Sequence, residues 1–254
     1  MKILYTIILA LVQGLTEFLP VSSSGHLILL EKLGVGEEDV FFNVMLHVGT
    51  LLAVLVAMRK EWLPLAKKPL QKTTGLLVVA CIPTVALAAV LKFAFPTLLT
   101  GRFLGFGFML TATLMFVGEN LQIAQHGVLS YKSVLLSGVL QGIAVLPGVS
   151  RSGATISCLT FLGVDKKTAS TFSFLLSIPI ILGSAIVEII DVAKGGFALS
   201  TPWYCIVIGI VVSFVSGLIA IKFFLKLIAR YSLLPFIIYT ALLGVVVSIL
   251  PLFL

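Results

Sequence analysis

The chain has 254 residues, of which 59% are hydrophobic and only 11% are charged, and its mean hydropathy is +1.21. This composition leaves too little polar surface to coat a water-soluble protein of this size, so it excludes a soluble globular fold and indicates that lipid is the solvent. The formal net charge of +7 does not indicate a nucleic-acid partner, because the basic residues lie in short clusters between apolar runs.

Two apolar runs along the chain are interrupted by polar loops. The first, Ile3 to Leu19, stops at Pro20 and restarts near Ser24. It has no signal-peptide cleavage site, so we expect it to be retained. The second, Ser133 to Leu146, stops at Pro147 and restarts near Ser152. Arms of about 13 to 17 residues, joined by such loops, predict two re-entrant helical hairpins.

Six further runs are uncharged or nearly so and are long enough to cross about 30 Å of hydrocarbon. Each is expected to form one transmembrane helix. In chain order they are Val40 to Met58, Thr73 to Leu91, Phe103 to Gly118, Thr168 to Val187, Phe197 to Ile221 and Tyr231 to Leu254.

The two interrupted runs match each other. Gln13 to Gly25 resembles Gln141 to Gly153, at an offset of 128 residues, which is half the chain. Each half then holds one hairpin followed by three spans, and because three is odd the halves must be inverted in the membrane. The sequence therefore predicts an all-α integral membrane protein with a single domain, residues 1–254, built from an inverted repeat of residues 1–127 and 128–254.

Loop charges predict the orientation. The segment Arg59 to Lys72 carries five Lys or Arg residues and is expected to be cytoplasmic. Alternation of the spans then puts one basic set inside (Lys166, Lys167, Lys222, Lys226 and Arg230) and one acidic set outside (Glu37, Glu38, Asp39, Glu188 and Asp191). The hairpins enter from opposite faces, the first from outside, so their loops are expected to meet near the midplane.

Both loops combine groups that bind anions. A helix restarts after each break, and free amides, hydroxyls and the positive end of a helix dipole favour an anion there. The guanidinium of Arg151 sharpens this preference toward phosphate. The alternative for any single serine is ordinary helix N-capping. We expect substrate binding by Gln13, Ser22, Ser24, Gly25, Ser150, Ser152, Gly153 and Thr155.

Glu17 lies at the inner end of the first arm, four residues after Gln13 on the same helical face. A carboxylate beside an anion site needs compensation, and three interpretations stay open. A divalent cation, Mg²⁺ or Ca²⁺, can be shared by Glu17, Gln13 and substrate phosphates; Glu17 can act as a general base; or it can pair with Arg151. His26 offers a proton carrier, or a histidine hydrogen-bonded within the hairpin. His47, inside a span, is interpreted as a packing residue.

Gln13 to His26 and Pro147 to Thr155 resemble the signature segments of the undecaprenyl-pyrophosphate phosphatase family, the bacitracin-resistance proteins. Spacing, chain length and flanking spans extend the resemblance over essentially the whole chain. It implies hydrolysis of undecaprenyl pyrophosphate to the lipid monophosphate that carries cell-wall precursors. It also implies a divalent metal and a bacterial inner-membrane location, with a site that opens toward the extracytoplasmic face.

The resemblance also implies residue roles. The family's acidic motif falls on Gln13 and Glu17, its serine and histidine on Ser23 and His26, and its phosphate-binding loop on Ser150, Arg151, Ser152 and Thr155. Members often have Glu where this chain has Gln13, so substrate phosphates are expected to complete any metal coordination. We interpret Ser23 as the nucleophile, Glu17 or His26 as its base and Arg151 as the phosphate clamp, while attack by metal-bound water stays open.

The competing interpretation is a secondary transporter or lipid flippase, since inverted repeats with broken helices are also transporter architecture. Phosphate release in detergent separates the two, because no gradient exists there. A structural scaffold needs no arginine at bilayer depth and ranks lowest. The expected partners are the isoprenyl pyrophosphate lipid and membrane lipids, without nucleic acid, and a homodimer is left open.

Overall fold

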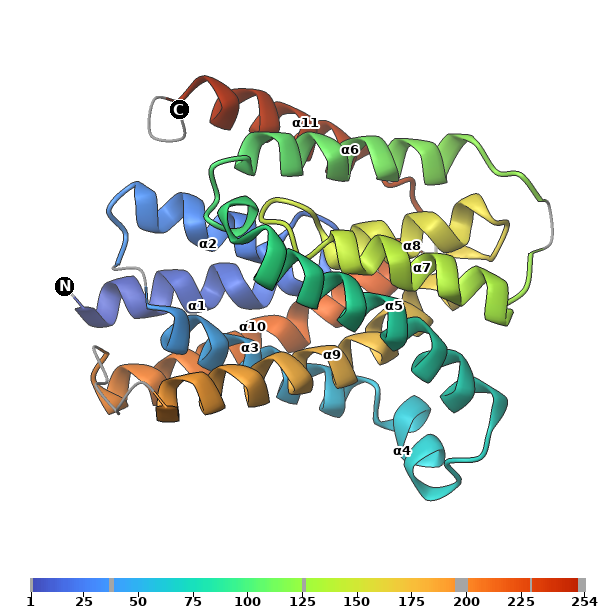
Figure 1. The fold of residues 1–254 in the computed structure, drawn as a ribbon, viewed down its shortest axis with the longest axis horizontal. Helices are drawn as coiled ribbons and strands as arrows, with labels where there is room; N and C mark the ends of the chain where they lie inside the picture. The colour runs from blue at the N-terminus through green and yellow to red at the C-terminus, as the bar shows by residue number, and fades with distance from the viewer. Residues whose placement is uncertain (1, 37–38, 125–126, 195–200, 229, 251–254) are drawn as a thin grey trace.

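The computed structural model of the chain describes residues 2–36, 39–124, 127–194, 201–228 and 230–250 (Figure 1). Over these residues the regular secondary structure is entirely helical. Four helices are long and apolar enough to span a membrane: α3 (Val40–Ala57), α5 (Lys72–Ala94), α9 (Lys166–Lys194) and α10 (Trp203–Ile228). The predicted all-α, multi-pass membrane protein is confirmed at this level.

Two shorter helices occupy the remaining predicted spans. They are α6 (Leu104–Asn120), with 17 residues, and α11 (Leu234–Ile249), with 16. At about 1.5 Å per residue they fall short of a hydrocarbon core of about 30 Å. Parts of the fifth and sixth predicted spans, residues 197–200 and 251–254, lie outside the described residues, as do Glu37, Glu38 and the side chains of Glu188 and Asp191.

The segment after α3 is helical, although its charges led us to treat it as a loop. Helix α4 (Arg59–Lys67) has no buried residue and carries Pro64 inside it. A short 3₁₀ helix, η1 (Pro96–Leu99), follows α5. Figure 1 shows α4 at one end of the molecule, opposite the N-terminus.

Both interruptions of the apolar runs are breaks between helices. Helix α1 (Lys2–Phe18) is followed by α2 (Ser23–Lys32), and α7 (Tyr131–Ile143) by α8 (Arg151–Phe161). Figure 1 shows α1 and α2 on the side of the N-terminus, α7 and α8 on the opposite side, and the two loops in the middle. The loops touch, because the Ser152 hydroxyl donates to the Leu19 carbonyl oxygen at 3.1 Å.

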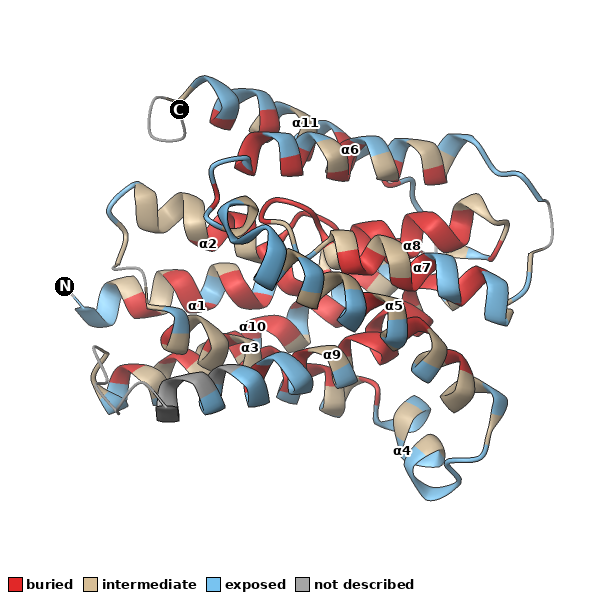
Figure 2. Cartoon of the chain, in the orientation of Figure 1, coloured by how far each residue is buried: buried red, intermediate tan, exposed pale blue. Residues whose placement is uncertain are grey.

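Helix packing encloses these loops. Helix α1 packs on α10 and α7 on α5, while α3 packs on both α9 and α10, and α6 on both α8 and α11. The buried residues of α1 recur every three to four positions, which puts one face against its neighbours: Thr6, Leu9, Ala10, Gln13, Gly14, Glu17 and Phe18. Figure 2 shows buried residues concentrated around the central loops.

The outer surface carries apolar stripes. On α10 the exposed side chains Val207, Val211, Val215 and Ile219 recur every four residues. Figure 2 shows exposed residues along the outward faces of the peripheral helices, including α5, α6 and α11. Such stripes have no packing partner within the described ranges, and a lipid environment accounts for them.

Candidate active site

A cavity of about 270 Å³ lies where the two central loops meet. Side chains from both loops line it, together with side chains from α3, α5, α7 and α9. The lining residues are Glu17, Ser22, Ser23, Ser24, His47, Thr84, Gln141, Ala144, Val145, Val149, Ser150, Arg151, Ile180, Ile181 and Ser184. A cavity that exposes charged and hydroxyl side chains at the centre of an apolar helical bundle is where a membrane protein is expected to hold a charged ligand.

Glu17 and Ser23 form the closest polar pair of the first loop. Glu17 is in the last turn of α1 and Ser23 is the first residue of α2, so the break around Pro20 folds the hydroxyl back onto the carboxylate. The Ser23 Oγ donates to Glu17 Oε2 at 2.5 Å, and both side chains are buried. A serine whose proton already points to a carboxylate is arranged for deprotonation.

Arg151 joins the second loop to the first. Its Nη2 donates to Glu17 Oε1, an ion pair between residues 134 positions apart in the sequence. Its other terminal nitrogen, Nη1, is buried and has no hydrogen-bond partner among the described residues. Because a guanidinium presents donors in a fixed fork, this nitrogen is available to an anion in the cavity.

Gln13 and His47 contact Oε2 of Glu17, the oxygen that also accepts from Ser23. Gln13 Nε2 donates to Glu17 Oε2 at 2.9 Å and lies 2.8 Å from His47 Nδ1. His47 Nδ1 is also 3.2 Å from Glu17 Oε2. A neutral imidazole accepts from Gln13 through Nδ1, whereas a protonated one faces Glu17 with an N–H group. His47 therefore belongs to the site, and its interpretation as a packing residue was wrong.

The first serine of each predicted anion loop is a helix cap. Ser22 Oγ accepts from the Gly25 amide at 3.3 Å, and Ser150 Oγ accepts from the Gly153 amide at 3.1 Å. Both serines also line the cavity, so each of them caps a helix and lies at the site at the same time. Ser22 has a φ of 69°, a left-handed conformation that non-glycine residues adopt mainly at functional or constrained positions.

Helix α6 supports the second loop from behind. The Thr111 hydroxyl donates to the Gly148 carbonyl oxygen at 2.9 Å and accepts from the Ser150 amide at 2.8 Å. Fixing both sides of Val149 in this way sets the position from which α8 starts. Arg151, the first residue of α8, is thereby aimed at Glu17.

Five of the eight residues expected to bind substrate are absent from the cavity lining: Gln13, described above with Glu17, and Gly25, Ser152, Gly153 and Thr155. Gly25 packs against Phe108 and Gly148, and Gly153 lies beside Ser150. The Ser152 hydroxyl donates to the Leu19 carbonyl oxygen, and the Thr155 hydroxyl lies 2.6 Å from Ser173 Oγ. The structure thus gives Gly25, Ser152, Gly153 and Thr155 supporting contacts rather than a place in the lining.

His26 also faces away from the cavity. Its Nδ1 lies 2.7 Å from the Ser22 carbonyl oxygen and its Nε2 2.6 Å from the Tyr239 hydroxyl. The ring stacks on Tyr239 and meets the edge of Phe108. Both ring nitrogens are therefore occupied, and His26 fixes the start of α2 against α6 and α11. The expectation of a proton carrier beside the hydroxyls does not match this geometry.

Three further polar lining residues were missed from the sequence: Thr84, Gln141 and Ser184. Gln141 Nε2 donates to the Thr84 hydroxyl at 2.9 Å, and Gln141 Oε1 is buried without a partner among the described residues. The 128-residue offset would have found Gln141, because it is the counterpart of Gln13. Nothing in the local sequence around Thr84 marks it as part of a site.

The donor set for a divalent cation is small. No cluster of three or more His, Cys, Asp or Glu side chains that could hold a metal occurs within the described ranges. Both oxygens of Glu17 already have partners, whereas the amide oxygen of Gln13 is buried and has no partner in the part of the chain that the structure describes. One carboxylate and one amide oxygen fit only a hard cation that takes its remaining ligands from phosphate oxygens and water.

The chain is similar to known proteins over nearly its whole length. The family model described as bacitracin resistance protein BacA matches residues 6–246. An undecaprenyl-diphosphatase of Carboxydothermus hydrogenoformans is 36% identical over 96% of this chain and 95% of its own length. Undecaprenyl-diphosphatase 4 of Bacillus thuringiensis subsp. konkukian is 37% identical over 97% and 96%, and the undecaprenyl-diphosphatase of Methanosphaera stadtmanae is 34% identical over 98% of both chains.

Proposed function

The chain belongs to the bacitracin resistance protein BacA family, and from this premise we propose that it hydrolyses undecaprenyl pyrophosphate to undecaprenyl phosphate and inorganic phosphate. Such a reaction returns the lipid carrier to cell-wall synthesis. One observation carries the proposal: the Ser23 hydroxyl donates to Glu17, and the other Glu17 oxygen pairs with Arg151, whose buried Nη1 has no partner among the residues that the structure describes. A nucleophile, its base and a phosphate clamp meet in one cavity.

Substrate binding uses the charge of Arg151 and the two helix starts. The terminal phosphate occupies the cavity with Arg151 Nη1 on one oxygen, and the amides at the starts of α2 and α8 neutralise further charge. The isoprenyl tail leaves the cavity between helices into lipid. Charge stabilisation of the transferring phosphoryl group is the largest contribution that such a site makes.

The chemical step transfers the terminal phosphoryl group to Ser23. The Ser23 Oγ attacks the terminal phosphorus as its proton moves to Glu17 Oε2, and the bond from that phosphorus to the bridging oxygen breaks. Undecaprenyl phosphate leaves with the bond's electrons. Water then attacks the phosphorus of the phosphoserine, and the bond from phosphorus to the Ser23 oxygen breaks. The departing serine oxygen takes back the proton held by Glu17, which restores the hydroxyl and the carboxylate, and the inorganic phosphate keeps both protons of the water.

We propose that a divalent cation, Mg²⁺ or Ca²⁺, assists when substrate is present. Glu17 and the amide oxygen of Gln13 would hold it, together with phosphate oxygens of the substrate. When bound, it would supply positive charge against the leaving phosphate. Because so few ligands come from the chain, we expect metal affinity to depend on substrate.

We propose the finer topology as six spans, with α6 and α11 completing the four long helices, and two re-entrant hairpins, α1–α2 and α7–α8. Supporting this, α1 packs on α10 as its counterpart α7 packs on α5, which is the counterpart of α10. The caps Ser22 and Ser150 are also 128 residues apart. Residues 1–127 and 128–254 are the proposed inverted repeats, within one domain.

The proposed location is the bacterial inner membrane, with the cavity open to the extracytoplasmic face. Supporting this, the α9 residues that line the cavity, Ile180, Ile181 and Ser184, lie from the middle of that helix toward the end remote from α4. Helix α4 and its neighbours carry the basic cluster, which is expected to stay in the cytoplasm. The homodimer stays a prediction.

The test is phosphate release from undecaprenyl pyrophosphate by the detergent-solubilised chain. We expect Ser23→Ala to lower turnover about 10³-fold or more, because the attacking oxygen is lost. Ser170→Ala is the matched control, since Ser170 is buried and bonded to the Lys166 carbonyl oxygen in its own helix, outside the cavity. It should keep near-normal turnover.

Each other outcome has a distinct meaning. Near-normal turnover in Ser23→Ala removes the covalent route and leaves water attack. Substrate binding without any phosphate release by the unmodified chain contradicts the enzyme and supports a carrier. Release that is unchanged when chelator removes divalent cations contradicts the proposed metal.

A further inference from the structure

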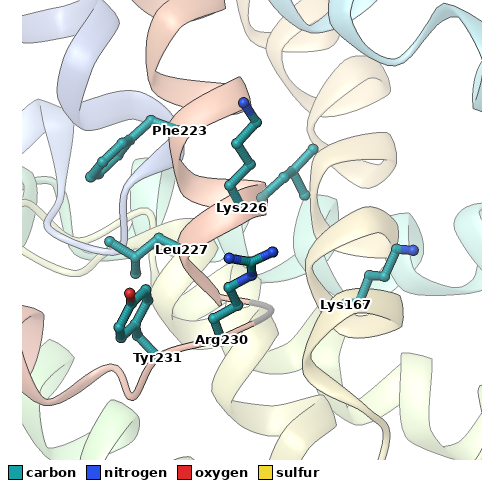
Figure 3. A pocket seen from close by; sticks show the side chains of 7 residues that line it. Lys167, Phe223, Lys226, Leu227, Arg230 and Tyr231 are labelled. Atoms are coloured by element: carbon teal, nitrogen blue, oxygen red, sulfur yellow. The ribbon is translucent and has the colours of Figure 1, made fainter.

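A second, larger cavity of about 710 Å³ lies between the start of α9 and the end of α10 (Figure 3). We call it the basic groove. Its lining residues are Lys167, Phe223, Leu225, Lys226, Leu227, Arg230 and Tyr231. None of these residues lines the candidate active site, so the groove is not part of the proposed phosphatase chemistry.

The groove is positively charged and lacks a compensating acid. Lys167, Lys226 and Arg230 are exposed, and none of them forms an ion pair within the part of the chain that the structure describes. The neighbouring acids are used elsewhere: Glu119 binds Lys166 at 2.7 Å, and Asp165 caps α9 by accepting from the Thr168 amide. Three cations around one cavity favour an anionic ligand.

One flank of the same groove is apolar. In Figure 3, Phe223, Leu227 and Tyr231 lie together on one flank of α10, while Lys226 and Arg230 lie on the side nearer to Lys167 of α9. Phe223 and Tyr231 are 55% and 66% exposed, although both are large aromatic side chains. Aromatic residues at the end of a membrane helix belong to the interface, where acyl chains meet headgroups. The ligand must therefore combine an anionic head with hydrocarbon.

The position of the groove narrows the ligand further. The start of α9 and the end of α10 lie at the same end of the molecule as α4, which carries Arg59, Lys60 and Lys67 (Figure 1). On the proposed topology this is the cytoplasmic end. Basic pockets between membrane helices on that side bind anionic lipid headgroups.

We propose that the basic groove is a binding site for one anionic phospholipid of the cytoplasmic leaflet. The lipid phosphate lies among Lys226, Arg230 and Lys167, and an acyl chain follows Phe223, Leu227 and Tyr231. Inorganic phosphate offers the same charge but leaves the apolar flank uncovered. The bound lipid bridges α9 and α10 at the membrane surface, and α9 also lines the catalytic cavity.

The test is native mass spectrometry of the delipidated full-length chain, titrated separately with phosphatidylglycerol and phosphatidylcholine. We expect the unmodified chain to prefer phosphatidylglycerol at one site. The double variant Lys226→Gln, Arg230→Gln should bind phosphatidylglycerol about 30-fold more weakly, given the contribution of two surface cations. Phosphate release should stay unchanged, which separates this result from any failure of the proposed function.

The matched control removes the same charge at the same end of the molecule. Arg59→Gln with Lys60→Gln alters two exposed cations at the start of α4, outside the groove, and should leave phosphatidylglycerol binding unchanged. Equal losses in the two double variants, or equal affinity for the two lipids, would overturn the proposal.

The apolar flank is tested by Tyr231→Ser, which keeps all three cations. We expect it to weaken phosphatidylglycerol binding several-fold without changing any competition by inorganic phosphate. Displacement of the lipid by low concentrations of inorganic phosphate, with no effect of Tyr231→Ser, would instead identify a simple anion site and refute a lipid site.

Discussion

At the residue scale, Arg151 has two proposed roles, pairing with Glu17 and binding phosphate, and each role uses a different terminal nitrogen. Nη2 pairs with Glu17, while Nη1 is left buried for a phosphate oxygen. A lysine keeps the positive charge but has one nitrogen, so it cannot hold the carboxylate and the phosphate in the same fork. We expect Arg151→Lys to lower the turnover of undecaprenyl pyrophosphate about 10²- to 10³-fold, as measured by phosphate release.

Arg102→Lys is the matched control for that substitution. Arg102 is exposed, precedes α6 and lies outside the cavity lining. The same change of side chain there should leave turnover within about twofold of the unmodified chain, as for surface substitutions in general. Comparable turnover in the two variants would show that the fork of Arg151 has no role in the reaction.

The sequence predicted the central residues of the site and missed others for a geometric reason. Glu17, Ser23 and Arg151 belong to motifs whose spacing puts them at helix breaks, and the structure brings them together. His26 depends on which way α2 is rotated, and its partner Tyr239 is 213 residues away. His47 depends likewise on the face that α3 turns inward. Neither rotation can be read from an apolar run without a clear polar stripe.

At the scale of elements, breaks were predicted better than surface helices. Pro20 and Pro147 with their neighbouring serines gave the two loops within a few residues, because proline ends a helix and serine starts the next. Helix α4 was missed, since its basic residues suggested a loop. None of its nine residues is fully buried, but Trp62 and Leu65 pack against the core, so the helix has a short apolar face that its charges and Pro64 obscured in the sequence.

The second loop depends on one glycine. Gly148 has a φ of 86°, and a Cβ placed there would lie 2.5 Å from the Leu104 carbonyl oxygen of α6. Gly148→Ala therefore combines backbone strain with a steric clash, and we expect it to cost about 2 to 4 kcal/mol. The measurement is the apparent melting temperature in detergent, with phosphate release recorded in parallel.

Gly34 is a natural control for the strain alone. Its φ of 85° is nearly the same, but a Cβ there would meet no atom within 4 Å. Gly34→Ala should cost only about 1 kcal/mol and leave phosphate release intact. If both variants lose the same stability, the close approach of α6 to the second loop does not contribute to holding Arg151 in place.

For the whole molecule, composition predicted the lipid environment, whereas the arrangement of the helices came only from the structure. An apolar sequence indicates that helices cross the membrane. It does not indicate which helices pack on one another, because nearly every helix face is hydrophobic. The internal match between Gln13 to Gly25 and Gln141 to Gly153 was the only long-range signal in the sequence. It predicted that the two loops approach each other, and the contact of Arg151 with Glu17 confirms that they do.

The orientation is the remaining whole-molecule prediction, and single cysteines can test it. In a chain whose three native cysteines are replaced by alanine, Val40→Cys at the start of α3 and Lys68→Cys after α4 report on opposite ends, and both positions are exposed. We expect a membrane-impermeant thiol reagent added to intact cells to label Val40→Cys only, because the basic cluster beside Lys68 stays cytoplasmic.

Leu242→Cys, in the middle of α11, separates water exposure from mere exposure on the protein surface. Leu242 is 62% exposed, but on the proposed topology it faces hydrocarbon, so the reagent should not reach it even in opened membranes. Lys68→Cys should become labelled when the membranes are opened. The reverse pattern would place the cavity toward the cytoplasm, where a phosphatase would meet the lipid pyrophosphate in the other leaflet, and it would move the basic groove to the outer surface.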